Sequence, residues 1–160
     1  MGEAFAICIA IQLSMALDHV HKHGVAHGEI AARHVLFTGA ENFSFIKLTG
    51  FGTSGKGVDK SRNQGKNSDT GGGLSSLQMG DIHSMGVLLY QMLTGDLPTV
   101  QSPGSSSSNY ISWGGEATVS EIGKDCVGNM MESKADFRSN ARSILSSPWL
   151  HTSAEQIQKL

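Results

Sequence analysis

Two segments of the chain carry apolar residues at the three- and four-residue spacing of an amphipathic helix. Gly24 follows the first segment, 5–21, at the point where such a helix ends, because glycine tolerates the left-handed backbone of a helix terminus. The second segment, 82–93, is preceded by Asp81, whose carboxylate suits an N-cap. The pattern predicts two long helices, each with one buried face. Their apolar positions are Ile9, Leu13, Ala16, Leu17 and Val20 in the first, and Ile82, Met85, Leu88, Leu89, Met92 and Leu93 in the second.

Shorter patterned pieces lie between and after these two helices. β-prone residues at 35–37 and 45–48, with a turn-like link at 38–42, predict one short β-hairpin. Two further helices are expected at about 119–132 and 140–145. Trp149 then predicts an aromatic side chain packed against the core. The fold class is therefore mainly α with a short β-hairpin.

Two other stretches lack apolar periodicity altogether. Residues 53–80 are rich in Gly, Ser, Asn and Lys, which predicts a mobile loop. Residues 101–109 contain four consecutive serines and are typical of a linker. The total of 160 residues allows one domain, and no internal repeat is visible.

The composition narrows the class of protein further. Hydrophobic residues make up 39% of the chain and the net charge is −2, so no basic excess indicates nucleic acid or an anionic membrane surface. Cys8 and Cys126 are too few and too far apart for a disulfide framework, which favours a reduced, cytoplasmic compartment. Glu3 stands where a signal peptide would carry positive charge, and no run is expected to reach the apolar length of a membrane span.

The most informative polar residues lie in two loops, 27–36 and 46–52. The first reads H-G-E-I-A-A-R-H-V-L and the second I-K-L-T-G-F-G. They resemble the catalytic and metal-binding loops of protein kinases, whose patterns are H-R-D-L-x-x-x-x-N and D-F-G. His27 matches the histidine of the first pattern, while Phe51 and Gly52 match the end of the second.

The residues that do chemistry in that family are substituted here. Glu29 stands in place of the catalytic Asp, and His34 in place of the Asn that holds magnesium. Gly50 replaces the metal-binding Asp of D-F-G. The resemblance places Leu36 under the adenine ring of a bound nucleotide, and residues 31–33 are similar to the version of the loop found in tyrosine kinases.

The later part of the chain extends the resemblance. Residues 81–90 are similar to the central helix of the kinase large lobe, in which Asp81 would support the catalytic loop and Gly86 would serve packing. Residues 131–150 resemble the ending common in serine/threonine kinases. Arg138 matches the arginine that pairs with the glutamate of A-P-E, but no such motif precedes Asp81.

The resemblance implies that residues 1–160 form one partial kinase domain, the large lobe. Residues 53–80 would be its activation segment, and neither a glycine-rich phosphate loop nor a V-A-I-K lysine is visible. In the family the face that meets the small lobe is apolar, so we expect poor solubility in isolation.

The substitutions predict that phosphoryl transfer is lost. Gly50 offers magnesium no oxygen, and the nitrogen of His34 suits zinc or copper better than a hard cation. Glu29 is one methylene longer than Asp, and a misplacement of about 1 Å can cost a hundredfold in rate. We therefore expect an inactive, pseudokinase-like domain, with ATP and magnesium possible only if a small lobe is supplied.

Two classes of function remain open. As a scaffold or regulatory binding module, the domain would bind protein partners, which could include other kinases. Its 53–80 loop could be phosphorylated in trans. As the large lobe of a longer tyrosine or serine/threonine kinase, it would keep ATP binding or weak phosphotransfer.

Two unrelated sites are also conceivable from the sequence. Residues 50–56 fit G-x-x-x-x-G-K, but a phosphate-binding P-loop needs Ser or Thr next and then a helix, and Gly57 follows here. A zinc site would need a completing cysteine or carboxylate pattern, which is not visible. The histidines that raise this possibility are His19, His21, His23, His27 and His34.

Overall fold

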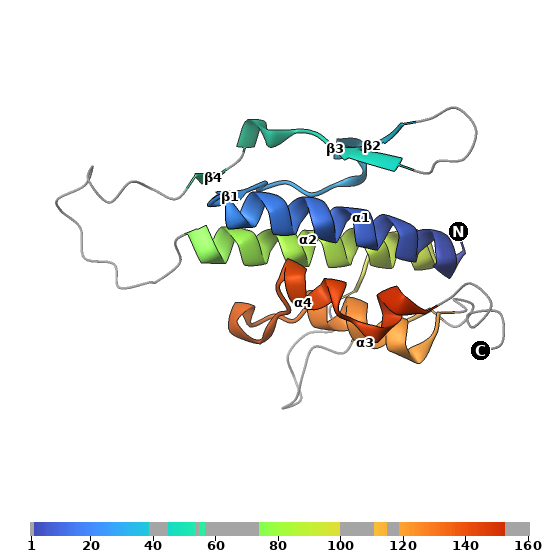
Figure 1. Cartoon of the computed structure of the whole chain (residues 1–160). Coiled ribbons are helices and arrows are strands. Elements are labelled where there is room, and N and C mark those ends of the chain that lie inside the picture. Colours follow the sequence, from blue (N-terminus) through green and yellow to red (C-terminus); the bar gives the residue numbers. More distant parts are fainter. Residues whose placement is uncertain are drawn as a thin grey trace.

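The centre of the structure is a pair of long helices that lie side by side and run in opposite directions (Figure 1). Helix α1 spans Glu3–Lys22 and helix α2 spans Leu74–Thr94. Helices α3 (Glu121–Met130) and α4 (Ala141–Leu145) pack on one side of the pair, and short β-strands lie on the other (Figure 1). This computed structural model describes residues 2–38, 45–53, 55–56, 74–99, 111–114 and 119–152.

Two small antiparallel ribbons carry the segments that resemble kinase loops. Strand β1 (Val25–Ala26) pairs with β4 (Gly55–Lys56), and β2 (Val35–Thr38) pairs with β3 (Phe45–Leu48). Val35 lies opposite Leu48, which brings the end of the first loop beside the start of the second. Short 3-10 turns complete the fold: η1 (Ala32–His34), η2 (Phe51–Thr53), η3 (Ala135–Phe137) and η4 (Pro148–His151).

Most of the predicted elements are confirmed. The first helix, the β2–β3 hairpin, the helices near 119–132 and 140–145, and the buried Trp149 are all present. The expected linker at 101–109 and most of the expected loop at 53–80 lie outside the described residues.

The second long helix begins earlier than its apolar pattern predicts. α2 starts at Leu74, so the prediction of an N-cap at Asp81 is wrong. The extra turns are held by partners from distant segments: Gln78 donates its side-chain amide to the carbonyl of His21 at 2.9 Å, and the Met79 carbonyl accepts from Arg138 Nη1 at 2.6 Å. No apolar periodicity marks these turns, since side chain to backbone bonds rather than apolar burial hold them.

A buried polar cluster ties the start of α1 to the end of the described chain. The Glu3 carboxylate accepts hydrogen bonds from Ser120 Oγ at 2.5 Å and from the indole nitrogen of Trp149 at 2.7 Å. All three residues are buried, and a buried carboxylate costs little only when its oxygens have such donors. Glu3 therefore stabilises the packing of α1 against α3 and η4.

Helix α1 also meets the length and composition of a membrane span, with a mean hydropathy of 1.4 over its most apolar window. The expectation that no run reaches that length is therefore wrong. The observation is weak support for a span, because core helices and signal sequences share these properties. Ile9, Leu13 and Leu17 of this helix are buried in the core that α1 forms with its neighbours.

The β2–β3 hairpin exposes large apolar side chains. Leu36 is 50% exposed, Phe37 43% and Phe45 68%. They belong to the ribbon on the opposite side of the helix pair from α3 and α4 (Figure 1). Exposed aromatic residues gathered on one hairpin are typical of a surface that another protein segment covers.

Helix α2 passes very close to the end of α3 at Gly86. A Cβ atom at this position would lie 2.8 Å from Met130 Cβ and 2.8 Å from Met131 Cγ. We expect Gly86→Ala to lower the free energy of unfolding by about 1–3 kcal/mol, as overpacked cores do.

Gly80→Ala is the matched control in the same helix, because nothing lies within 4 Å of a Cβ there. Urea titration should show it as more stable by up to about 1 kcal/mol, from helix propensity alone. Equal effects of the two substitutions would contradict the close approach at Gly86.

Candidate functional site

The Asp81 carboxylate is the anchor of the first loop. It is 2% exposed, and its two oxygens accept hydrogen bonds from the backbone amides of His27 and Gly28, both at 2.7 Å. His21 Nε2 lies 2.8 Å from the same carboxylate. One buried side chain of α2 thus fixes the backbone of the loop and the end of α1.

His27 carries this constraint on to the second loop. Its Nδ1 accepts from the amide of Glu29 at 3.1 Å, so the proton lies on Nε2, which donates to the Thr49 carbonyl at 2.7 Å. Its ring also lies 4.6 Å from that of Phe51, centroid to centroid. The buried imidazole therefore connects the two loops through both polar and aromatic contacts.

His34 and Gly50 occupy one shared space. A Cβ atom on Gly50 would lie 2.5 Å from His34 Cδ2 and 2.7 Å from its Cγ, so the imidazole ring lies directly against the glycine. The ring is held there because Nδ1 donates to the Glu29 carbonyl at 2.8 Å. The His34 carbonyl accepts from the amide of Thr49 at 2.8 Å. Gly50 has a φ of +86°, which a side chain rarely adopts.

This arrangement does not fit a magnesium ion. Magnesium prefers oxygen ligands, whereas position 50 has no side chain and position 34 offers a ring whose Nδ1 is already bonded to a carbonyl. The imidazole fills the volume that a carboxylate on residue 50 would need. The two positions that the sequence singled out are thus brought together, in an arrangement that excludes the oxygen ligands.

Glu29 lies within the first loop, near the surface. Its side chain is 41% exposed and forms an ion pair with Arg33, four residues further on. Leu36 follows on β2 as a half-exposed residue.

Arg138 binds backbone oxygens. Its Nε and Nη2 donate to the Glu132 carbonyl at 2.9 and 2.6 Å, and Nη1 reaches the carbonyl of Met79 on α2. Burial lowers the pKa of this guanidinium, and the nearby Glu132 opposes that shift. Arg138 thus joins the segment after α3 to the early turns of α2.

The sequence analysis did not predict the contacts that His21 and Thr49 make in the structure. His21 entered that set only as a possible zinc ligand, yet it contacts Asp81, while Thr49 bonds both His27 and His34. The backbone groups that accept these bonds leave no mark in the sequence. The signal that the segments meet was the resemblance of residues 81–90 to the central kinase helix, in which Asp81 would support the first loop.

The two unrelated sites find no support. Gly55 and Lys56 form strand β4 rather than the start of a helix, which contradicts a P-loop. The rings of His19 and His23 lie 4.5 Å apart in a tilted arrangement, but His23 Nδ1 faces the His19 carbonyl. Within the described parts of the chain, no three His, Cys, Asp or Glu side chains come together as a metal site.

The fold is a helical lobe in which a buried aspartate of the central helix holds one loop, and a second loop packs against the first. This combination is typical of a kinase-like domain. The profile described as "Protein kinase domain" matches residues 1–150. The chain belongs to the protein kinase domain family.

Two curated relatives are serine/threonine kinases. Serine/threonine-protein kinase cds1 of Schizosaccharomyces pombe is 30% identical over 164 residues, which cover 88% of this chain and 35% of that protein. Ribosomal protein S6 kinase alpha-1 of Rattus norvegicus is 38% identical over 80 residues, 44% of this chain and 11% of that protein. The chain therefore spans about a third or less of the length of these relatives.

Solved structures share the fold. The Rad53 kinase domain and SCD2 in complex with AMPPNP gives a TM-score of 0.72 at 22% identity, covering 96% of this chain and 62% of that one. The structure of the Rad53 kinase domain and SCD2 gives a TM-score of 0.73 at 21% identity, covering 99% of this chain and 66% of that one. The mainly α fold with its small hairpin is that of kinase domains.

Asp81→Asn tests the anchor of the first loop. The amide can accept from only one of the two backbone N–H groups and turns a donor towards the other, so we expect a loss of about 2–3 kcal/mol in unfolding free energy. Hydrogen exchange should show faster exchange at His27 and Gly28 in particular. Asp125→Asn, on the exposed face of α3, is the matched control and should change neither the unfolding free energy nor the exchange rates of these amides. Slow exchange retained at both amides in the Asp81 variant would contradict the anchor.

Proposed function

We propose that this chain is a protein kinase-like domain that does not transfer phosphate and acts as a signalling scaffold or regulatory binding module. The observation that carries the proposal is the His34 imidazole against the α-carbon of Gly50. Phosphoryl transfer depends on metal ions that neutralise charge on the phosphates. With the ring in the place of an oxygen ligand, that neutralisation has no support from these two loops.

The state of Glu29 supports the same conclusion. The residue that would accept the proton of a substrate hydroxyl is exposed and paired with Arg33. A general base needs both position and an available lone pair near the reacting atom. Loss of the metal ligands and engagement of the base in an ion pair act on separate parts of the reaction, so together they leave little to stabilise a transition state.

A binding role is supported by the retained contacts of the two loops and by the exposed hairpin. The bonds from Asp81 to the first loop, and from His27 to the second, preserve the shape of the lobe. The hairpin bearing Phe37 and Phe45 offers an exposed apolar surface. Protein partners, other kinases among them, are the class that such a surface would bind, and the free thiols of Cys8 and Cys126 accord with a reduced, cytoplasmic location.

The second candidate is the large lobe of a longer kinase that still binds nucleotide. The retained Asp81 anchor and the relationship to serine/threonine kinases favour it. A solved neighbour, the Rad53 kinase domain, was crystallised with AMPPNP. In this case ATP would bind through a small lobe and Leu36, with magnesium contributing little.

A thermal-shift titration with ATP separates these candidates. A ligand at a hundred times its dissociation constant stabilises a folded protein by about 2.7 kcal/mol, which raises the midpoint by several degrees. With ATP at roughly 5 mM and magnesium or manganese present, we expect the unfolding midpoint to rise by less than about 1 °C. We also expect no phosphotransfer to a peptide mixture.

The double variant His34→Asn with Gly50→Asp is the matched comparison, because it restores both oxygen ligands and removes the ring. We expect its midpoint, relative to its own metal-free state, to rise with manganese and ATP. A magnesium-dependent shift or phosphotransfer by the unaltered chain would contradict the proposed inactivity. A metal-independent ATP shift would favour the second candidate.

A further inference from the structure

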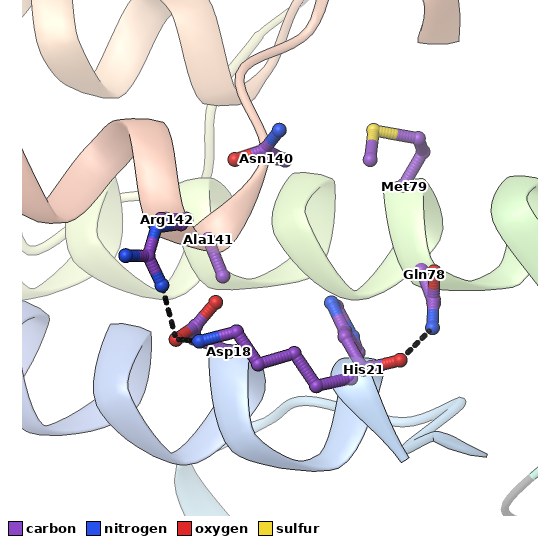
Figure 2. Close-up of a pocket in the computed structure, with 8 residues that line it drawn as sticks. Asp18, His21, Gln78, Met79, Asn140, Ala141 and Arg142 are labelled. Carbon is purple, nitrogen blue, oxygen red and sulfur yellow. Dashed lines mark hydrogen bonds and ion pairs between the residues drawn. The ribbon is translucent and has the colours of Figure 1, made fainter. Parts of the chain in front are cut away.

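A pocket of about 270 Å³ lies where α1 ends, beside the early turns of α2 and the start of α4 (Figure 2). Of the elements that line it, α4 lies on the opposite side of the helix pair from the β-ribbons (Figure 1). Asp18, His21 and Lys22 come from α1, Gln78 and Met79 from α2, and Arg142 from α4. His21 also contacts the Asp81 carboxylate, but Lys22 and Arg142 take no part in the contacts described above for the two loops.

Two cations share a single carboxylate at this pocket. Lys22 Nζ lies 2.5 Å from Asp18 Oδ2, and Arg142 Nη1 lies 3.9 Å from the same oxygen (Figure 2). Both cations therefore stand close enough for one further anion to reach them together. The Asp18 side chain is 18% exposed, whereas those of Lys22 and Arg142 are 51% and 73% exposed. The surplus positive charge thus faces outward.

The remaining lining includes one partly exposed apolar side chain, Met79, because Ala141 is buried. The side-chain oxygen of Asn140 caps α4 by accepting from the Ser143 amide at 2.8 Å. Gln78 is committed to the His21 carbonyl. The available polar groups are therefore donors with positive charge, placed beside a small apolar surface.

We propose that this pocket binds a phosphorylated serine or threonine side chain presented on a peptide of a protein partner. A phosphomonoester carries a charge of about −1.5 to −2 and three acceptor oxygens, which matches two cations that have only one carboxylate between them. A plain carboxylate would bring a single charge, as Asp18 already does. Met79 would contact an apolar residue of the peptide near the phosphate. This inference rests on the proposed role as a binding module and names the partner's chemistry.

Fluorescence anisotropy with a labelled degenerate peptide library tests the proposal. The library has one fixed phosphoserine, and an identical library with serine in its place is the reference. We expect the phosphorylated library to bind at least about tenfold more tightly, and more weakly as salt rises, because exposed charges are screened. Lys22→Glu with Arg142→Glu should remove that preference.

Lys124→Glu with Lys134→Glu is the matched control, since it changes the net charge equally at two lysines outside the pocket lining, the half-buried Lys124 and the exposed Lys134. It should bind the phosphorylated library within about twofold of the unaltered chain, and circular dichroism should show every variant folded. Equal binding of both libraries, or equal loss in the two double variants, would overturn the proposal.

Inorganic phosphate as competitor distinguishes the two sources of a phosphate group. Weak competition, only at millimolar phosphate, is expected if the peptide contributes to binding. Inorganic phosphate that binds as tightly as the library would overturn the peptide assignment. The ATP titration described above uses different residues, so failure here would leave the non-catalytic role standing.

Discussion

The buried carboxylate of Asp81 is the constraint on which the rest of the site depends. It joins the central helix to the backbone of the first loop and to His21 at the end of α1. Such a group is costly to bury unless its oxygens are satisfied, and here three donors surround it. The loop therefore keeps its shape for reasons that have nothing to do with catalysis, which is why the lobe can keep its architecture while its chemistry changes.

The site chemistry has changed in a coupled way. His34 is larger than the Asn of the family pattern, and Gly50 is smaller than its Asp, so the ring of one fills the space that the other gives up. The residue types at positions 34 and 50 depend on each other, because a side chain on residue 50 would collide with the His34 imidazole. Such a side chain would also be strained by the positive φ of Gly50. The pair is closely packed but gives magnesium no oxygen, which would link the proposed loss of activity to this packing.

Much of this fold follows from the sequence, because apolar spacing marks α1 and most of α2, and the order of the loop motifs marks the family. The early turns of α2 could not be predicted, since Gln78 and Met79 are held by polar partners far along the chain. The sequence indicated that His34 and Gly50 are poor metal ligands. Their contact, like the Glu3 cluster with Trp149, depends on tertiary packing that no local pattern encodes.

A double-mutant cycle between His34 and Gly50 tests the shared space most directly. Gly50→Ala should destabilise the unaltered chain through both the collision and the backbone, but in a His34→Ala background only the backbone cost remains. Urea unfolding should therefore give a coupling energy of at least about 1 kcal/mol. Effects that add within about 0.5 kcal/mol would mean that the ring does not occupy the space of the missing side chain.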